Sequence, residues 1–140
     1  MIDPEILVFS IVKMAEGVKS VIGDKGSKAV LRDSGRQAGP KMFENIMGHF
    51  PETLAREDAI LRSCVLMQEL GFAEQVFKEQ GQIIFHKDAF THAMEGDLSS
   101  SPLIYFLMGL IEGFVQYLSK EKLTLEVQEV KSGSITFKYL

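Results

Sequence analysis

Apolar residues recur with helical spacing from the start of the chain. Residues 4–22 place an apolar side chain at about every third or fourth position, which is the period of an amphipathic helix. Asp3 and Pro4 are residue types that begin helices, and Gly23 is a natural stop. The pattern therefore predicts a first helix over these residues.

A second helical segment follows, and it contains several helix-breaking residues. Gly35, Gly39 and Pro40 are expected to interrupt it, because glycine lowers helix stability and proline lacks the backbone N–H donor. Residues 41–49 would then form a separate helical piece that ends at Pro51.

The middle of the chain predicts one more helix and then a hairpin. Thr53 is expected to cap a helix of about 16 residues that stops at Gly71. Residues 72–77 and 82–87 have the composition of strands, and Gly81 lies in the short turn between them. Glycine adopts the positive φ that a tight hairpin turn requires, so the two strands are expected to pair.

Residues 102–118 form the most apolar segment, and Ser101 and Pro102 are expected to begin it as a helix. The segment is shorter than the roughly 20 residues that a membrane span needs and contains a charged residue, so we expect a buried core helix with no transmembrane segment. Gly109 and Gly113 lie four residues apart on one face of this helix. They allow either close backbone packing, which we favour, or room for a ligand.

Residues 123–127 and 135–139 alternate between apolar and polar side chains, which is the period of a half-buried strand. A turn at residues 132–134 joins them. The fold class is therefore α+β, with N-terminal helices, a four-stranded antiparallel sheet made of two hairpins, and the buried apolar helix at about 102–118 between them. The 140 residues are expected to form a single domain, 1–140.

Composition narrows the function classes. The net charge of −4 and the absence of a dense Lys/Arg run argue against a nucleic-acid partner. A single cysteine, Cys64, cannot form an internal disulfide, which indicates a reducing compartment, so we expect a cytoplasmic protein. The acidic start of the chain is unlike a secretory signal.

Catalytic motifs are missing from the sequence, and we expect neither a cofactor nor a metal site. The three histidines, His49, His86 and His92, lack the tight spacing of metal ligands, and there is no cysteine pair. Cys64 lies on an apolar helix face and is expected to be a buried structural residue.

Glu112 is the only charged residue of the apolar helix. It can face solvent, which we favour, pair with a basic side chain, or line a polar part of a pocket. Together with His86 or His92 it is the sole candidate for an acid–base site, because a buried carboxylate with a raised pKa would indicate function.

Three segments resemble the 4-vinyl reductase (hydrocarbon-binding) domain family. Residues 21–39 are similar to its opening motif of a helix, a glycine, Leu-Arg-x-x-Gly and a further glycine. Residues 106–114, with Gly109 and Gly113, look like its Gly-x-x-x-Gly helix, and residues 126–139 match the register of its final motif. The likeness extends over nearly the whole chain.

The resemblance implies an α+β fold similar to TRAPP subunits and heme nitric-oxide-binding domains, often dimeric and with an apolar cavity. It also implies a ligand-sensing module or an accessory factor in pigment synthesis that binds small apolar molecules or acyl chains. Two positions where many relatives have cysteine hold Glu129 and Phe137 here, so a cysteine-based metal or redox role is not implied. The Tyr-x-Ser-x-Arg heme signature is also missing.

Three functions stay open at this point. The first is a non-enzymatic module that binds or senses a small apolar ligand between the apolar helix and the sheet. The second is a homodimeric structural or assembly protein with a filled core, and the third is a reductase accessory subunit. For the first, the expected ligand-binding residues are large apolar side chains and the two helix glycines: Phe72, Phe85, Phe106, Gly109, Leu110, Gly113 and Phe114.

Overall fold

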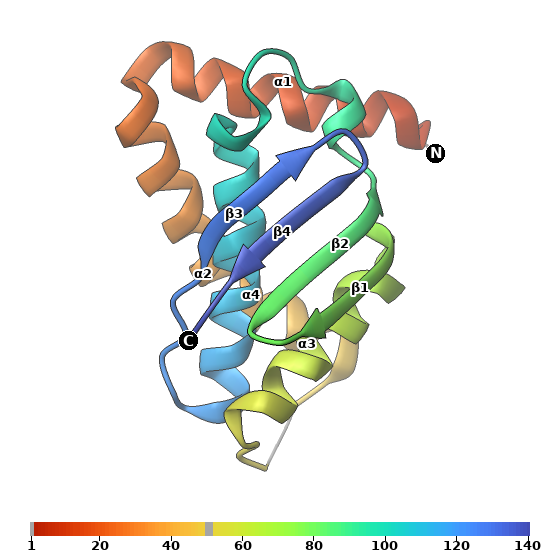
Figure 1. Ribbon diagram of the computed structural model, residues 1–140, viewed down its shortest axis with the longest axis vertical. Helices are drawn as coiled ribbons and strands as arrows, with labels where there is room; N and C mark the ends of the chain where they lie inside the picture. The colour runs from red at the N-terminus through yellow and green to blue at the C-terminus, as the bar shows by residue number, and fades with distance from the viewer. Residues whose placement is uncertain (1, 50–51) are drawn as a thin grey trace.

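Two antiparallel hairpins form one four-stranded sheet, and helices cover one of its faces (Figure 1). The structure is a computed structural model that describes residues 2–49 and 52–140. In chain order the main elements are α1 (Pro4–Ile22), α2 (Asp24–Met47), α3 (Arg56–Glu69), β1 (Ala73–Glu79), β2 (Gln82–Asp88), α4 (Pro102–Ser119), β3 (Glu126–Lys131) and β4 (Ser134–Lys138). Two short 3-10 turns, η1 (Thr91–Ala93) and η2 (Leu98–Ser100), lie between β2 and α4.

The strand order is β1-β2-β4-β3, so each hairpin contributes one inner and one outer strand. The inner strands β2 and β4 pair antiparallel, with Phe85 opposite Ile135 and Ile83 opposite Phe137. The turn between β1 and β2 has positive φ at both Gln80 and Gly81, as tight hairpins require. The predicted α+β architecture, with two hairpins and an apolar helix between them along the chain, is confirmed.

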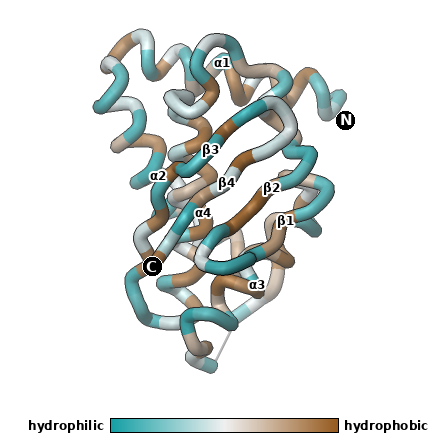
Figure 2. Tube along the Cα trace, in the orientation of Figure 1, coloured by the Kyte–Doolittle hydropathy of each residue, from teal (hydrophilic) through white to brown (hydrophobic). Residues whose placement is uncertain are grey.

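The core lies between the sheet and α4. Alternate residues of the two inner strands are fully buried, and Figure 2 shows the hydrophobic middle of β2 beside the hydrophilic turn that precedes it. Helix α4 runs directly behind the sheet, and nearly all of its residues are buried. Among the described residues, α4 is the one helix long and apolar enough to cross a membrane, but 78% of it is buried inside the protein. It is the central helix of the fold.

Helix α2 corrects one prediction from the sequence. It runs without interruption from Asp24 to Met47, although it contains Gly35, Gly39 and Pro40. Tertiary packing explains the difference, because both glycines are buried against α4, and such packing outweighs intrinsic helix propensity. The proposed stop at Pro51 lies outside the described residues.

Several element ends also differ from the predictions. Helix α3 begins at Arg56, and its N-cap is Ala55, so Thr53 does not cap it. The Asp3 carboxylate does cap α1, accepting a 2.8 Å hydrogen bond from the Glu5 N–H, whereas Ser101 is the N-cap of α4 without a side-chain hydrogen bond. Strand β3 begins only at Glu126.

Candidate functional site

Helices α2 and α4 approach each other through glycines on both sides. A Cβ atom added to Gly109 would overlap the Arg32 carbonyl oxygen, and one added to Gly113 would lie 2.6 Å from the Arg36 carbonyl oxygen. On the other helix, a Cβ atom at Gly39 would lie 2.8 Å from the Leu110 carbonyl oxygen. The glycine face of α4 is thus in contact with the α2 backbone, as in the close-packing alternative favoured above.

Pro40 fits the same crossing. It has no N–H to donate to the Arg36 carbonyl one turn earlier, which is the cost of proline inside a helix. That carbonyl instead lies against Gly113, where a side chain would collide with it. The proline and the glycine therefore occur at the same point of the helix–helix contact.

Glu112 is buried beside this crossing and pairs with two arginines of α2. Its side chain is 2% exposed. Its Oε1 accepts hydrogen bonds of 2.9 Å from the Nε atoms of both Arg32 and Arg36. Its Oε2 accepts the backbone N–H of Leu125 at 2.9 Å, and Arg32 also donates to the Leu125 carbonyl at 2.8 Å. The carboxylate therefore connects α2, α4 and the segment that leads into β3.

These contacts decide the ionisation state of Glu112. Burial alone would raise the pKa of its carboxyl group, but the hydrogen bonds from Arg32, from the Leu125 N–H and from Arg36 outweigh burial, so the pKa lies below its usual value. The group is thus a buried, charged and fully bonded carboxylate. Of the three environments considered for Glu112, the structure shows the ion pair, and the preference for a solvent-facing side chain was wrong.

The seven residues predicted to bind a ligand belong to the packed interior or its margin. Phe85, Leu110 and Phe114 are fully buried, Phe72 and Phe106 are partly buried, and Gly109 and Gly113 contact α2. Three of their four aromatic rings pack against a ring outside this set of seven. Phe85 packs edge-to-face on Phe137 with ring centroids 5.9 Å apart, and Phe114 packs on Phe43 at 6.0 Å.

Phe72 belongs to a third ring pair, with Phe90 at 5.8 Å. The structure therefore brings these aromatic residues into one continuous core rather than around one open space.

The histidine candidates do not converge with Glu112. His92 Nε2 lies 3.2 Å from a carboxylate oxygen of Glu5 on α1, and His86 is exposed on β2. Cys64 is buried, and burial raises the pKa of its thiol to about 12, so it is not a nucleophile at neutral pH. Within residues 2–49 and 52–140, no three His, Cys, Asp or Glu side chains lie close enough to hold a metal ion.

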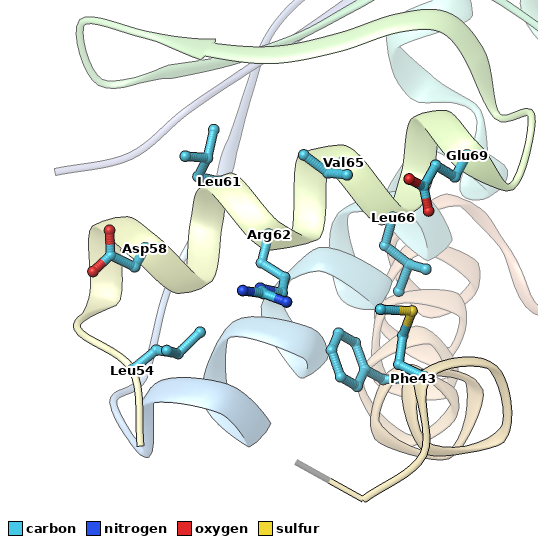
Figure 3. Close-up of a pocket in the computed structure, with 9 residues that line it drawn as sticks. Phe43, Leu54, Asp58, Leu61, Arg62, Val65, Leu66 and Glu69 are labelled. Carbon is cyan, nitrogen blue, oxygen red and sulfur yellow. The ribbon is translucent and has the colours of Figure 1, made fainter. Parts of the chain in front are cut away.

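An apolar groove lies between the end of α2 and α3, and we call it the α2–α3 groove (Figure 3). Its volume is about 580 Å³. The lining side chains are mostly apolar: Phe43, Met47, Leu54, Leu61, Val65 and Leu66, with Asp58, Arg62 and Glu69. Figure 3 shows the Arg62 guanidinium between Leu54 and Phe43, whereas Asp58 and Glu69 lie toward the two ends of α3. Phe43 and Leu66 are buried at its base, whereas Leu61 and Val65 remain about half exposed.

None of the seven predicted residues lines this groove, yet the sequence contains a signal for it. Helix α3 has more apolar positions than one buried face can use: Ile60, Cys64 and Met67 are buried, and Leu61 and Val65 follow one position later on an adjacent face. No ligand-binding residue was predicted on this second apolar face.

No family model matches the chain, and no curated protein sequence matches it. The candidate site therefore rests on its geometry.

Proposed function

We propose that the protein is a non-enzymatic binding module for a small apolar ligand, which is held in the α2–α3 groove. The observation that supports this most directly is a groove whose lining is mostly apolar and includes the half-exposed Leu61 and Val65. Ligand sites are concave and mostly apolar, with a few polar groups that fix orientation, and this groove has that composition.

The energetics favour an occupant of this kind. Leu61 and Val65 keep about half of their surface in water, and burying an aliphatic side chain completely contributes about 1.5–3 kcal/mol, so covering both would contribute about 1 kcal/mol each. The charged side chains in the lining, Asp58, Arg62 and Glu69, offer contacts for one polar end of the ligand.

The proposed ligand class is also the one that the resemblance to the hydrocarbon-binding domain family implies. That resemblance is carried by α4, by residues 21–39 and by the second hairpin. The site proposed here differs from the original expectation, because the space between α4 and the sheet is filled by core side chains, whereas the α2–α3 groove is open. The same proposal includes a cytoplasmic location for the protein and a binding role without a catalytic step.

The test is a matched pair of valine substitutions. Val65 in the groove and Val30 on α2 both lie on helices and are both 48% exposed, so an aspartate at either position has a similar effect on folding. Titration of an uncharged fluorescent probe, N-phenyl-1-naphthylamine, should show binding that V65D weakens about tenfold and V30D leaves unchanged, since a carboxylate in an apolar site must lose its hydration. Equal effects of the two substitutions, or no saturable binding by the wild type, would contradict the proposal.

A homodimer is the second candidate, and the outer face of α1 supports it. Ile6, Ser10, Met14, Gly17 and Val21 recur every three or four residues along this helix, so they form one stripe. None of them is charged, and Ile6, Met14 and Val21 are 62%, 72% and 84% exposed. A monomer rarely leaves such a stripe in water.

The stripe also matches itself when it is reversed. In an antiparallel pair of α1 helices, Ile6 would face Val21 of the second copy, and Ser10 would face Gly17, with Met14 beside the two-fold axis. Large residues thus meet large ones, and the small pair lets the helices approach closely. This self-complementarity is what a two-fold interface between identical chains requires.

Sedimentation velocity over a range of protein concentrations tests the dimer. M14E would place two like charges beside the axis, so we expect a wild-type dimer to become a monomer in this variant. V30E serves as the control with the same charge on another helix. A wild-type protein that sediments as a monomer at every concentration would exclude this candidate.

A further inference from the structure

A second pocket, of about 510 Å³, lies beside the C-terminal end of β4, and we call it the basic pocket. Three cationic side chains from separate parts of the chain line it: Arg56 from the first turn of α3, Lys122 from the α4–β3 connection, and Lys138 from β4. One carboxylate, Glu126, also lines it. Positive charge is therefore concentrated here in a chain whose net charge is −4.

Two of the three cations have a carboxylate within ion-pair distance, but neither contact is as short as an ordinary hydrogen bond. Lys138 Nζ lies 3.4 Å from Glu126, and an Arg56 terminal nitrogen lies 3.6 Å from Glu57, both beyond ordinary hydrogen-bond length. Glu57 in turn accepts a 2.9 Å hydrogen bond from Lys78, which is its closer partner. Lys122 has no ion-pair partner within the part of the chain that the structure describes.

The walls of the basic pocket are held in place by contacts of their own. The guanidinium of Arg56 lies over the ring of Tyr139, 5.7 Å from its centroid, and the Tyr139 hydroxyl donates to Glu57 at 3.1 Å. Leu123 is buried behind the pocket. A guanidinium in a fixed plane, together with two ammonium groups, is the donor set that suits a doubly charged phosphate group.

We propose that the basic pocket binds the phosphate group of a small phosphomonoester. Arg56, Lys122 and Lys138 would contact the phosphate oxygens. The remaining volume would take the organic substituent against Tyr139 and Leu123. No residue lines both the basic pocket and the α2–α3 groove, so this site stands independently of the apolar-ligand proposal.

Lys122 is the side chain to change, because it is exposed and unpaired, so K122Q should fold normally. K25Q makes the same charge change at the start of α2, which Figure 1 shows near the top of the molecule, well above the C-terminus. Phenyl phosphate is titrated into each protein at low salt, and amide chemical shifts of the pocket residues report its binding. Inorganic phosphate is titrated in a parallel series.

We expect phenyl phosphate to shift amides of residues 122–124 and 138–140, with an apparent Kd raised about fivefold by K122Q and unchanged by K25Q, since a charge-assisted hydrogen bond is lost only in the former. Phenyl phosphate should also bind more tightly than inorganic phosphate. Amide chemical-shift changes spread over the whole surface would contradict a phosphate site in this pocket. An equal loss of affinity for phenyl phosphate in K122Q and K25Q would contradict it as well. Equal affinity for phenyl phosphate and inorganic phosphate would contradict the proposal that the pocket also binds the organic substituent.

Discussion

Helices α2 and α1 lie side by side in the sequence, yet they relate to the rest of the molecule in opposite ways. Helix α2 is poor in large apolar residues but contacts α4 through Gly35 and Gly39. Helix α1 is rich in apolar residues, yet only Val12 and Ala15 are fully buried. From hydropathy alone, α1 would be expected to be the more buried of the two helices, and it is not.

The difference separates surfaces that are buried within the protein from apolar surfaces that remain exposed to water. At the glycine crossing the backbones of α2 and α4 are in contact, and the buried Glu112 carboxylate accepts hydrogen bonds at both oxygens. Along α1 and the outer face of α3, apolar side chains remain in water. Binding is therefore expected at the second kind of region, and the first kind provides the rigid frame behind it.

The largest expected effect is at the glycine crossing. G109A would place a methyl group on the Arg32 carbonyl oxygen, and a backbone atom cannot move aside as a flexible side chain can. We expect a loss of about 3 kcal/mol in the free energy of unfolding, at the upper end of overpacking effects. Urea denaturation followed by circular dichroism measures it.

Gly26, near the start of α2, supplies the control. A Cβ atom there would lie 3.7 Å from the Ile22 side chain, which is an ordinary contact. G26A should therefore leave the protein unchanged or stabilise it by up to about 1 kcal/mol, because alanine is the better helix former. A G109A protein as stable as G26A would mean that the two helices are not in backbone contact at the crossing.

The sequence predicted most of the fold because its hydrophobic periods are regular. Both hairpins and the buried helix of residues 102–118 follow from alternation, turn glycines and a continuous apolar run. The continuity of α2 could not be predicted the same way, because Gly35, Gly39 and Pro40 weaken a helix locally. These residues are compatible with a continuous helix only because α2 packs against α4, which lies more than 70 residues later in the chain.

The candidate site was less accessible to prediction, for a related reason. Large apolar residues such as Phe85 and Phe114 have the same appearance in a sequence whether they line a cavity or fill a core. The useful signal was the surplus of apolar positions on α3, at Leu61 and Val65, which a single buried face does not need. Likewise, Glu112 alone does not reveal its partners, since Arg32 and Arg36 lie about 80 residues earlier.

Substitution of Glu112 tests the packed α2–α4 crossing in a second way, with a smaller expected effect on the free energy of unfolding that depends on pH. E112Q keeps the shape of the side chain but removes its charge, leaving Arg32 and Arg36 without their anion. Breaking a buried ion pair costs about 3–5 kcal/mol, but both arginines are partly exposed and can regain water, so we expect a loss of about 2 kcal/mol at pH 7.

The pH dependence separates this charge effect from a packing effect. Because the pKa of Glu112 is lower in the folded protein than in the unfolded chain, its ionised form stabilises the fold above the usual carboxyl pKa of 4.5. That stabilisation is lost as the pH falls below 4.5 and through the lower folded pKa. The stability difference between wild type and E112Q, measured by urea denaturation from pH 7 to pH 3, should therefore shrink toward the acid end. A constant difference would mean that the substitution disturbs packing and that the ion pair adds no net stability. The crossing of α2 and α4 would then depend on its glycines alone.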